Sequence, residues 1–129
     1  MDEVVIGKKS FPALVAITSE EQNQGLMWKK WPPPVMAFPS NPQVRKFWMK
    51  NTPSPLDIVF CRGNRIISIC KGEPFSTSLI GPDDATDLVI EFPAGTIESI
   101  GVGVGDAATL KYSAKTAARA CKQAMYLVG

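Results

Sequence analysis

The chain has 129 residues, of which 45% are hydrophobic and 20% charged, and its formal net charge is +2 at pH 7. This composition predicts one folded domain over residues 1–129, and the small net charge gives no reason to expect nucleic acid as a partner. There is no histidine, which excludes Ser-His-Asp and Cys-His catalysis within one chain and removes the commonest metal ligand.

Cysteine usage and the N-terminal segment bear on location. None of Cys61, Cys70 and Cys121 lies in a C-x-x-C pair, so no metal site is expected. An odd number of thiols favours a reducing cytoplasm. The apolar segments 4–6 and 13–17 are too short for a signal sequence or a membrane span. We therefore expect a soluble, cytoplasmic protein without a membrane partner, although a chain from which an export signal had been removed would look the same.

The first half of the chain is punctuated by proline and glycine, which favours short strands over a helix bundle. Residues 11–17 are expected to form a strand. Thr18 and Glu21 then fit a capping box, in which each side chain satisfies the other residue's backbone amide. The short helix that follows should end near Gly25.

Residues 28–34 contain three consecutive prolines and are expected to form a turn, and residues 35–38 a short strand. The clearest hairpin follows, with strands at 56–61 and 65–71 joined at Gly63 and Asn64, which tolerate positive φ.

A two-residue turn pairs Arg62 with Arg65, Cys61 with Ile66, Phe60 with Ile67, Ile58 with Ile69 and Asp57 with Cys70. Alternation then gives one face Ile58, Phe60, Ile67 and Ile69, and the other Asp57, Val59, Cys61, Ile66 and Cys70. Both faces are largely apolar, so the hairpin should be covered on both sides. The register also separates Cys61 from Cys70, which argues against a disulfide between them.

The remaining elements are a polar loop at 72–87, a strand at 88–92, a short helical turn within 93–100 and a strand at 107–112. The predicted fold is mainly β, a single-domain β-sandwich or partly open barrel with two or three short helices. Ser113 can cap a final helix that runs to about residue 127. The apolar stripe of this helix comprises Ala114, Ala117, Ala118, Cys121, Met125 and Val128. We expect the stripe to dock on the β-domain of a monomer, with a homodimer through this helix as the alternative.

A series of short motifs resembles a known family. The motifs occur in the order G-L-M from Gly25, F-W-M-K-N-T from Phe47, P-L-D from Pro55, A-G-T from Ala94 and G-D from Gly105. They are similar to the uncharacterised family called domain of unknown function 192, over about residues 13–110. The resemblance implies a compact β-rich domain and no assigned reaction, cofactor or partner.

Two features depart from the family pattern. Relatives carry a G-M-L-F-V-F-like strand where this chain has residues 35–38 followed by Pro39. The helical segment 113–129 also continues beyond the usual end of the family.

The segment 48–57 is the candidate site. Trp48 offers a flat aromatic face, Lys50 an anion contact, and Asn51 and Asp57 orienting polar groups, which together suit a small polar or anionic ligand. The structural alternative is that Asn51 and Asp57 hydrogen-bond the backbone near the prolines while Trp48 fills the core.

Three other groups of residues have simpler explanations. Cations interleave with aromatics at 28–31 and 45–48, as in proteins that bind single-stranded nucleic acid, but those aromatics can equally be core residues. The glycines at 101–105 do not fit G-x-G-x-x-G and indicate a tight turn. The acidic residues at 83–87 lack the spacing of a calcium loop and indicate a solvated loop.

The sequence therefore predicts a small-ligand or partner-binding β-module with Trp48, Lys50, Asn51 and Asp57 at its site, and it indicates no catalytic residue set and no cofactor. The alternative is a hydrolase or group-transfer enzyme that uses Lys50 and Asp57 on a polar or carbohydrate-like substrate. A third hypothesis is a protein-interaction domain that uses its C-terminal helix.

Overall fold

The computed structural model describes residues 2–128, and it contains seven strands and three helices in this part of the chain. The strands are β1 (Glu3–Ile6), β2 (Lys9–Val15), β3 (Val35–Val44), β4 (Leu56–Arg62), β5 (Arg65–Gly72), β6 (Ala85–Pro93) and β7 (Ala108–Lys111). The helices are α1 (Ser19–Gln24), α2 (Thr96–Ile100) and α3 (Ala114–Val128). No helix within residues 2–128 is both long and apolar enough to cross a membrane.

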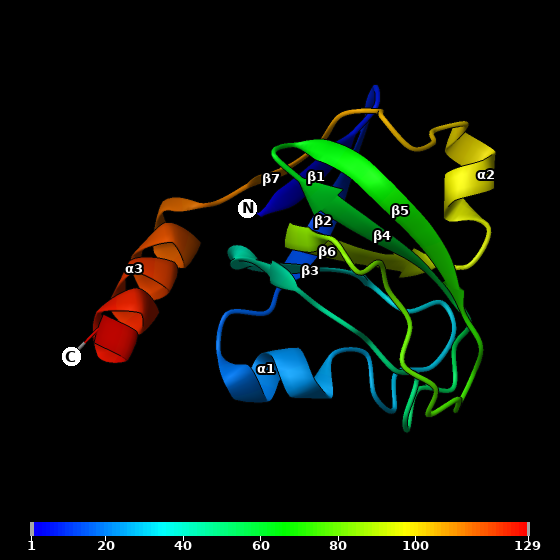
Figure 1. Ribbon diagram of the computed structural model, residues 1–129, viewed down its shortest axis with the longest axis horizontal. Coiled ribbons are helices and arrows are strands. Elements are labelled where there is room, and N and C mark those ends of the chain that lie inside the picture. The colour runs from blue at the N-terminus through cyan, green and yellow to red at the C-terminus, as the bar shows by residue number, and fades with distance from the viewer. Residues whose placement is uncertain (1, 129) are drawn as a thin grey trace.

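The strands form one sheet in the order β5-β4-β6-β3-β2-β1-β7 (Figure 1). β2 joins the two halves of the sheet, because its first residues pair with β1 and its last three pair in parallel with β3. All other pairings are antiparallel.

The sheet curls until its two edge strands meet. The start of β5 approaches the entry to β7, where Arg65 and Ala107 form an isolated bridge. The Ile66 amide donates to the Asp106 carbonyl at 2.9 Å and the Ile66 carbonyl accepts from the Gly105 amide at 2.8 Å. The result is a curled half-barrel, which confirms the mainly β, partly open barrel form predicted from the sequence.

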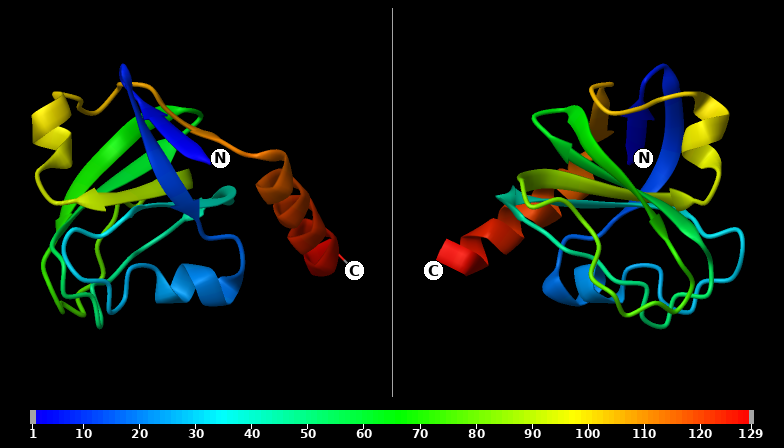
Figure 2. Two further views of the ribbon diagram at one scale, coloured as in Figure 1. Left: turned by 180° about the vertical axis from the view of Figure 1, so that it is seen from behind. Right: turned by 45° about the vertical axis from the view of Figure 1, so that its right-hand side comes forward.

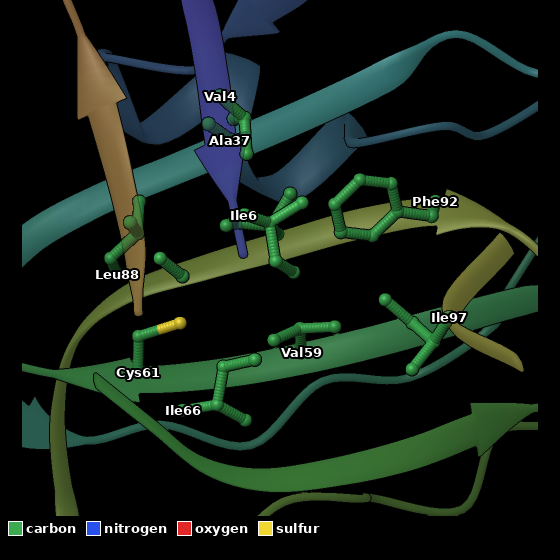
Figure 3. Close-up of a cluster of buried hydrophobic side chains, with 11 residues drawn as sticks. Val4, Ile6, Ala37, Val59, Cys61, Ile66, Leu88, Phe92 and Ile97 are labelled. Carbon is green, nitrogen blue, oxygen red and sulfur yellow. The ribbon is translucent and has the colours of Figure 1, made fainter. Parts of the chain in front are cut away.

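Two apolar clusters lie on the two faces of the curled sheet. The inner cluster contains Val4, Ile6, Ala37, Val59, Cys61, Ile66, Leu88, Ile90, Phe92, Ile97 and Ala108, whose side chains meet inside the curl (Figure 3). The outer cluster contains Ala16, Leu26, Met36, Phe38, Met49, Leu56, Ile58, Phe60 and Val89. β4 is buried on both faces, as predicted from the apolar residues on both faces of the hairpin.

The hairpin register differs from the prediction beyond its turn. Cys61 pairs with Ile66 as expected, but a bulge shifts Phe60 onto Ser68 and Ile58 onto Cys70. A bulge inserts one extra residue into one strand and so exchanges the faces of the residues that follow. Ile69 therefore packs on the inner cluster and Cys70 on the outer one, the reverse of the predicted faces, and both thiols are free.

β1 is a strand that sequence reasoning did not assign, although its apolar residues were noted. It forms a hairpin with β2 through a turn at Gly7, and it pairs with β7 on its other side. Val4 and Ile6 are fully buried in the inner cluster. β1 is thus part of the core.

The final helix stands away from the barrel in both views of Figure 2. Ser113 caps it as predicted, since the Ser113 hydroxyl accepts from the Thr116 amide at 3.2 Å. The predicted docking of the apolar stripe on the barrel is not seen for the stripe residues whose side chains are described. These residues, Ala114, Ala117, Ala118 and Cys121, are exposed. Met125 and Val128 lie outside the residues whose side chains are described.

Candidate functional site

Residues 47–50 alternate between the core and the surface. Met49 is buried in the outer cluster and Phe47 packs against it, whereas Trp48 and Lys50 point the other way and are exposed. Hydrogen bonds fix this extended run: Phe47 and Ile80 exchange two at 2.8 Å, and the Met49 amide donates to the Ser76 carbonyl at 2.8 Å. A period of two places Trp48 and Lys50 on one side.

That side faces a cleft of about 340 Å³ between α1 and residues 43–52. Trp48, Lys50 and Arg45 lie along one wall, the residues that end α1 form the other, and Phe38 and Glu91 form the floor. The Lys50 ammonium lies 5.1 Å from the centroid of the Trp48 ring, a cation–π contact. The structure thus brings two of the predicted site residues together at an open cavity.

Gln22 ties the two walls of the cleft to the sheet. Its amide nitrogen donates to the Ala16 and Pro39 carbonyls at 3.1 and 3.0 Å. Its amide oxygen accepts from Arg45 Nη2 at 3.0 Å. The capping box predicted at Thr18 and Glu21 is present, so α1 is held at both its start and its middle.

Arg45 brings a half-buried positive charge to the wall. Its guanidinium donates to the Phe38 carbonyl and to Gln22 and lies 5.2 Å from the Phe47 ring centroid. All of these partners are neutral, and no carboxylate pairs with Arg45 among residues 2–128. Burial lowers the pKa of Arg45, yet a guanidinium remains charged in proteins.

Glu91 is the one acid in the floor of the cleft. It lies on β6 between Met36 of β3 and Ile58 of β4, and it is only 4% exposed. Burial raises its pKa from 4.5 to about 8, because a charged carboxylate is poorly solvated there. The side chain is therefore neutral near pH 7 and can donate a hydrogen bond.

Asn51 acts through its backbone. Its φ of +56° is in the left-handed region, which asparagine tolerates better than most residues. Its carbonyl accepts from the Trp28 amide at 2.7 Å. Trp28 and Phe75 also have positive φ, and the Phe75 amide donates to the Thr52 carbonyl at 3.1 Å. Asn51 therefore joins two loops beside the cleft.

Asp57 lies on the opposite face of the sheet. Its carboxylate oxygen Oδ2 accepts from the Gly95 and Ile97 amides, each at 3.0 Å, at the start of α2. Its strand partner is Phe92 of the inner cluster, whereas the next pair, Ile58 with Glu91, faces the cleft. Successive residues of a strand point to opposite faces, so Asp57 and Lys50 do not share a cavity.

The other polar groups that the sequence singled out have local partners. Asp83 pairs with Lys46 at 2.8 Å, and Asp87 accepts from the Gly63 amide at 3.1 Å. Burial, with a smaller contribution from Asp87, raises the pKa of Cys61 to about 12, which makes it an unreactive thiol. In the described part of the chain, no three acidic or thiol groups are arranged to hold a metal ion.

Sequence reasoning missed Glu91 and the positioning of Arg45. The signal for Glu91 was an acid inside the apolar run Leu88–Phe92, where a buried charge is costly. Arg45 was noticed only as one of several cations. Its contact with Gln22 joins residues that are 23 positions apart, and no spacing rule would have revealed it.

The fold and the cleft define a small half-barrel protein with a cationic, aromatic-walled cavity on the outer face of its sheet. The chain belongs to the DUF192 family, described as "Uncharacterized ACR", whose model matches residues 3–110. The match includes β1 and ends at β7, so α3 lies beyond it.

Two solved structures share this fold. One, a protein of unknown function from Novosphingobium aromaticivorans DSM 12444, is 29% identical, with a TM-score of 0.77 and coverage of 83% of each chain. The other, from Sinorhizobium meliloti 1021, is described as a "putative transcription regulator". It is 28% identical, with a TM-score of 0.77 and coverage of 84% of this chain and 93% of that one. A comparison with curated proteins finds no match.

Proposed function

We propose that this protein is a binding module for a small anionic molecule, held in the cleft between α1 and residues 43–52. The observation that carries the proposal is the pair of cations, Arg45 and Lys50, whose contacts in the described chain are all with neutral groups. Unpaired cations at a concave surface attract anions.

The makeup of the walls adds support. Trp48 is 43% exposed, although a large aromatic side chain is normally covered. Met49, its neighbour, is buried and fills the core instead. Trp48 and Lys50 thus contribute little to the packed interior, which is expected of side chains that contact a ligand.

A hydrolase or group-transfer enzyme that uses Lys50 and Asp57 receives less support. Such a mechanism needs both groups within reach of one substrate. Asp57 instead caps α2 from the inner face. The geometry therefore favours binding over catalysis by this pair.

The test is a thermal-shift screen of small anions, namely sulfate, phosphate, and aliphatic and aromatic carboxylates, followed by titration of each anion that stabilises the protein. We expect Lys50→Met to leave the melting temperature without ligand unchanged and to weaken binding at least about tenfold, since a charged contact contributes about 1.5–3 kcal/mol. The control Lys111→Met, at an exposed position on β7, should bind as the wild type does. Equal loss of stability and binding in Lys50→Met would assign this lysine a structural role.

A further inference from the structure

Glu91 is a buried acid that anion binding alone does not explain. It interrupts the apolar strand β6 on the face that carries Val89 of the outer cluster. Within residues 2–128, no hydrogen bond to its carboxyl group is found. Among residues 2–128, the fully enclosed side-chain atom without a partner is Thr86 Oγ1, so the Glu91 oxygens, although the residue is 4% exposed, still open on the cleft. A molecule bound in the cleft can therefore meet them.

Gly25 leaves this carboxyl group open to the cleft. A Cβ atom at Gly25 would lie 3.7 Å from Glu91 Oε1 and 3.5 Å from Phe38 Cζ. The glycine has φ of +49°, a conformation that ends α1 and that side chains rarely adopt. A side chain at this position would cover the acid, and the absence of one keeps it accessible.

The charged groups around Glu91 are committed elsewhere or point to neutral partners. On residues 43–52, Lys46 pairs with Asp83, Arg45 contacts Phe38 and Gln22, and Lys50 lies over Trp48. On α1, Glu21 accepts from Thr18 and Arg119. The residues opposite Glu91 on β3 and β4 are apolar. Within residues 2–128 no cation forms an ion pair with Glu91, and burial raises its pKa to about 8.

We propose that the ligand of this cleft is a small organic carboxylate that accepts a hydrogen bond from the carboxylic acid of Glu91 and faces Arg45 and Lys50. The inference rests on the proposed function and names its ligand class. A carboxylate has two oxygens in one plane, so one can meet the acid while the other meets a cation, and O–H···O⁻ bonds are short and strong. Phe38, Phe47 and Trp48 offer an apolar surface to the body of the ligand.

Proton-linked affinity follows from this arrangement. Binding of the carboxylate requires the protonated form of Glu91, because two carboxylates in contact repel each other. Affinity should be constant below the pKa of about 8. Above it, affinity should fall by up to about tenfold per pH unit.

The experiment compares three ligands that share a benzene ring but differ in charge: benzoate, benzamide and benzyltrimethylammonium. Their charges stay constant from about pH 6 to about pH 9, the range over which Glu91 titrates. Binding to the full chain is measured by calorimetry, and by ¹³C NMR of the Glu91 carboxyl carbon with and without benzoate. Glu91→Gln is neutral at every pH and keeps a donor, while Glu98→Gln on the exposed face of α2 is the matched control.

We expect benzoate to bind more tightly than benzamide, with affinity falling above the pKa in the wild type and in Glu98→Gln. Glu91→Gln should bind benzoate with no pH dependence, and saturation with benzoate should raise the pKa of Glu91. Benzoate binding that does not change with pH, or benzyltrimethylammonium binding that strengthens as pH rises, would overturn the inference.

The carboxylate assignment and the proposed anion-binding function can be rejected independently of each other. If benzoate does not bind but sulfate or phosphate protects the protein through Lys50, the cleft binds anions and the carboxylate assignment is rejected. If no anion in the screen protects the protein, the proposed function itself is rejected.

Discussion

Asp57 is one of the residues for which the sequence leaves both a ligand contact and a structural role open. It is 5% exposed, and one oxygen accepts from two amides at the start of α2. We predict that Asp57→Ala lowers the free energy of unfolding by about 1–3 kcal/mol, because it leaves these donors without a partner. Urea denaturation measures this change.

The control for Asp57 is Asp84→Ala, at an exposed acid of the 73–84 loop, which should change stability by less than about 0.5 kcal/mol. Unchanged stability in Asp57→Ala would show that the contacts with α2 contribute nothing. Weaker anion binding by a variant of unchanged stability would return Asp57 to the list of ligand contacts.

Glu91 predicts a pH dependence of folding even without ligand. Its pKa is about 8 in the folded chain against an ordinary 4.5, so the folded state binds more protons between these values. Stability should therefore fall as pH rises from about 5 to about 8, by up to about 1.4 kcal/mol per unit. In Glu91→Gln this contribution is absent, and its stability measured by denaturation should fall less over the same range. A wild type and variant with parallel profiles would contradict this prediction.

The sequence pointed to two residues of the candidate site, and the reason is physical. Trp48 and Lys50 belong to a run whose alternation and unusual makeup can be read locally, and both line the cleft. Asp57 was drawn into the same hypothesis by proximity in the chain, but one step along a strand moves a side chain to the other face. Glu91 lies 43 positions after Trp48 in the chain, and only the folded sheet brings the two residues to one cleft.

At the level of elements, the sequence predicted those whose signals are local. The capping box of α1 and the turn of the β4–β5 hairpin are set by residues within a few positions of each other. The bulge beyond the turn was not predictable from alternation, since it depends on how β4 pairs with β6 and on how both strands of the hairpin pack on the core. β1 was missed because a run of four residues is too short for its alternation to establish a strand.

α3 supplies a prediction at the scale of an element. It is held by Asp2, which accepts from the Ser113 amide at 2.7 Å and the Thr116 hydroxyl at 2.6 Å, and by the exposed ion pair of Arg119 with Glu21. A cap contributes about 1 kcal/mol and an exposed ion pair less. We predict that deleting residues 113–129 leaves a folded monomer whose free energy of unfolding is lower by no more than about 2 kcal/mol.

Denaturation and sedimentation of the two chains check this prediction. A truncated chain that loses its cooperative transition would show that the helix is needed by the barrel. A dimeric full-length chain that becomes a folded monomer on truncation would establish the alternative, a homodimer through the exposed stripe. Asp2→Asn, with the helix retained, separates the loss of the anchor from the loss of the helix.

At the scale of the molecule, composition and punctuation were enough to predict a mainly β domain, either a sandwich or a partly open barrel, but not to choose between the two. They could not give the strand order, because the pairings that define it are remote: β3 with β6, and β1 with β7. Each of these joins apolar strands that have several acceptable partners on pattern alone. Which strands pair depends on how the whole curled sheet packs around its core, and this is not visible in the pattern of any single strand.

The pairing of the first strand with the last has a consequence for how the protein is made. Val4 and Ile6 enter the inner cluster beside Ala108, and their strand bonds to residues 108–111. On a ribosome β1 emerges long before β7, so its outer partner does not exist until residues 108–111 have been made. Strand pairing over such a separation is slow, and unpaired apolar edges invite aggregation in the meantime. Nascent chains that stop before residue 108 should therefore depend on chaperones, and the barrel should close only after residues 108–111 have been made.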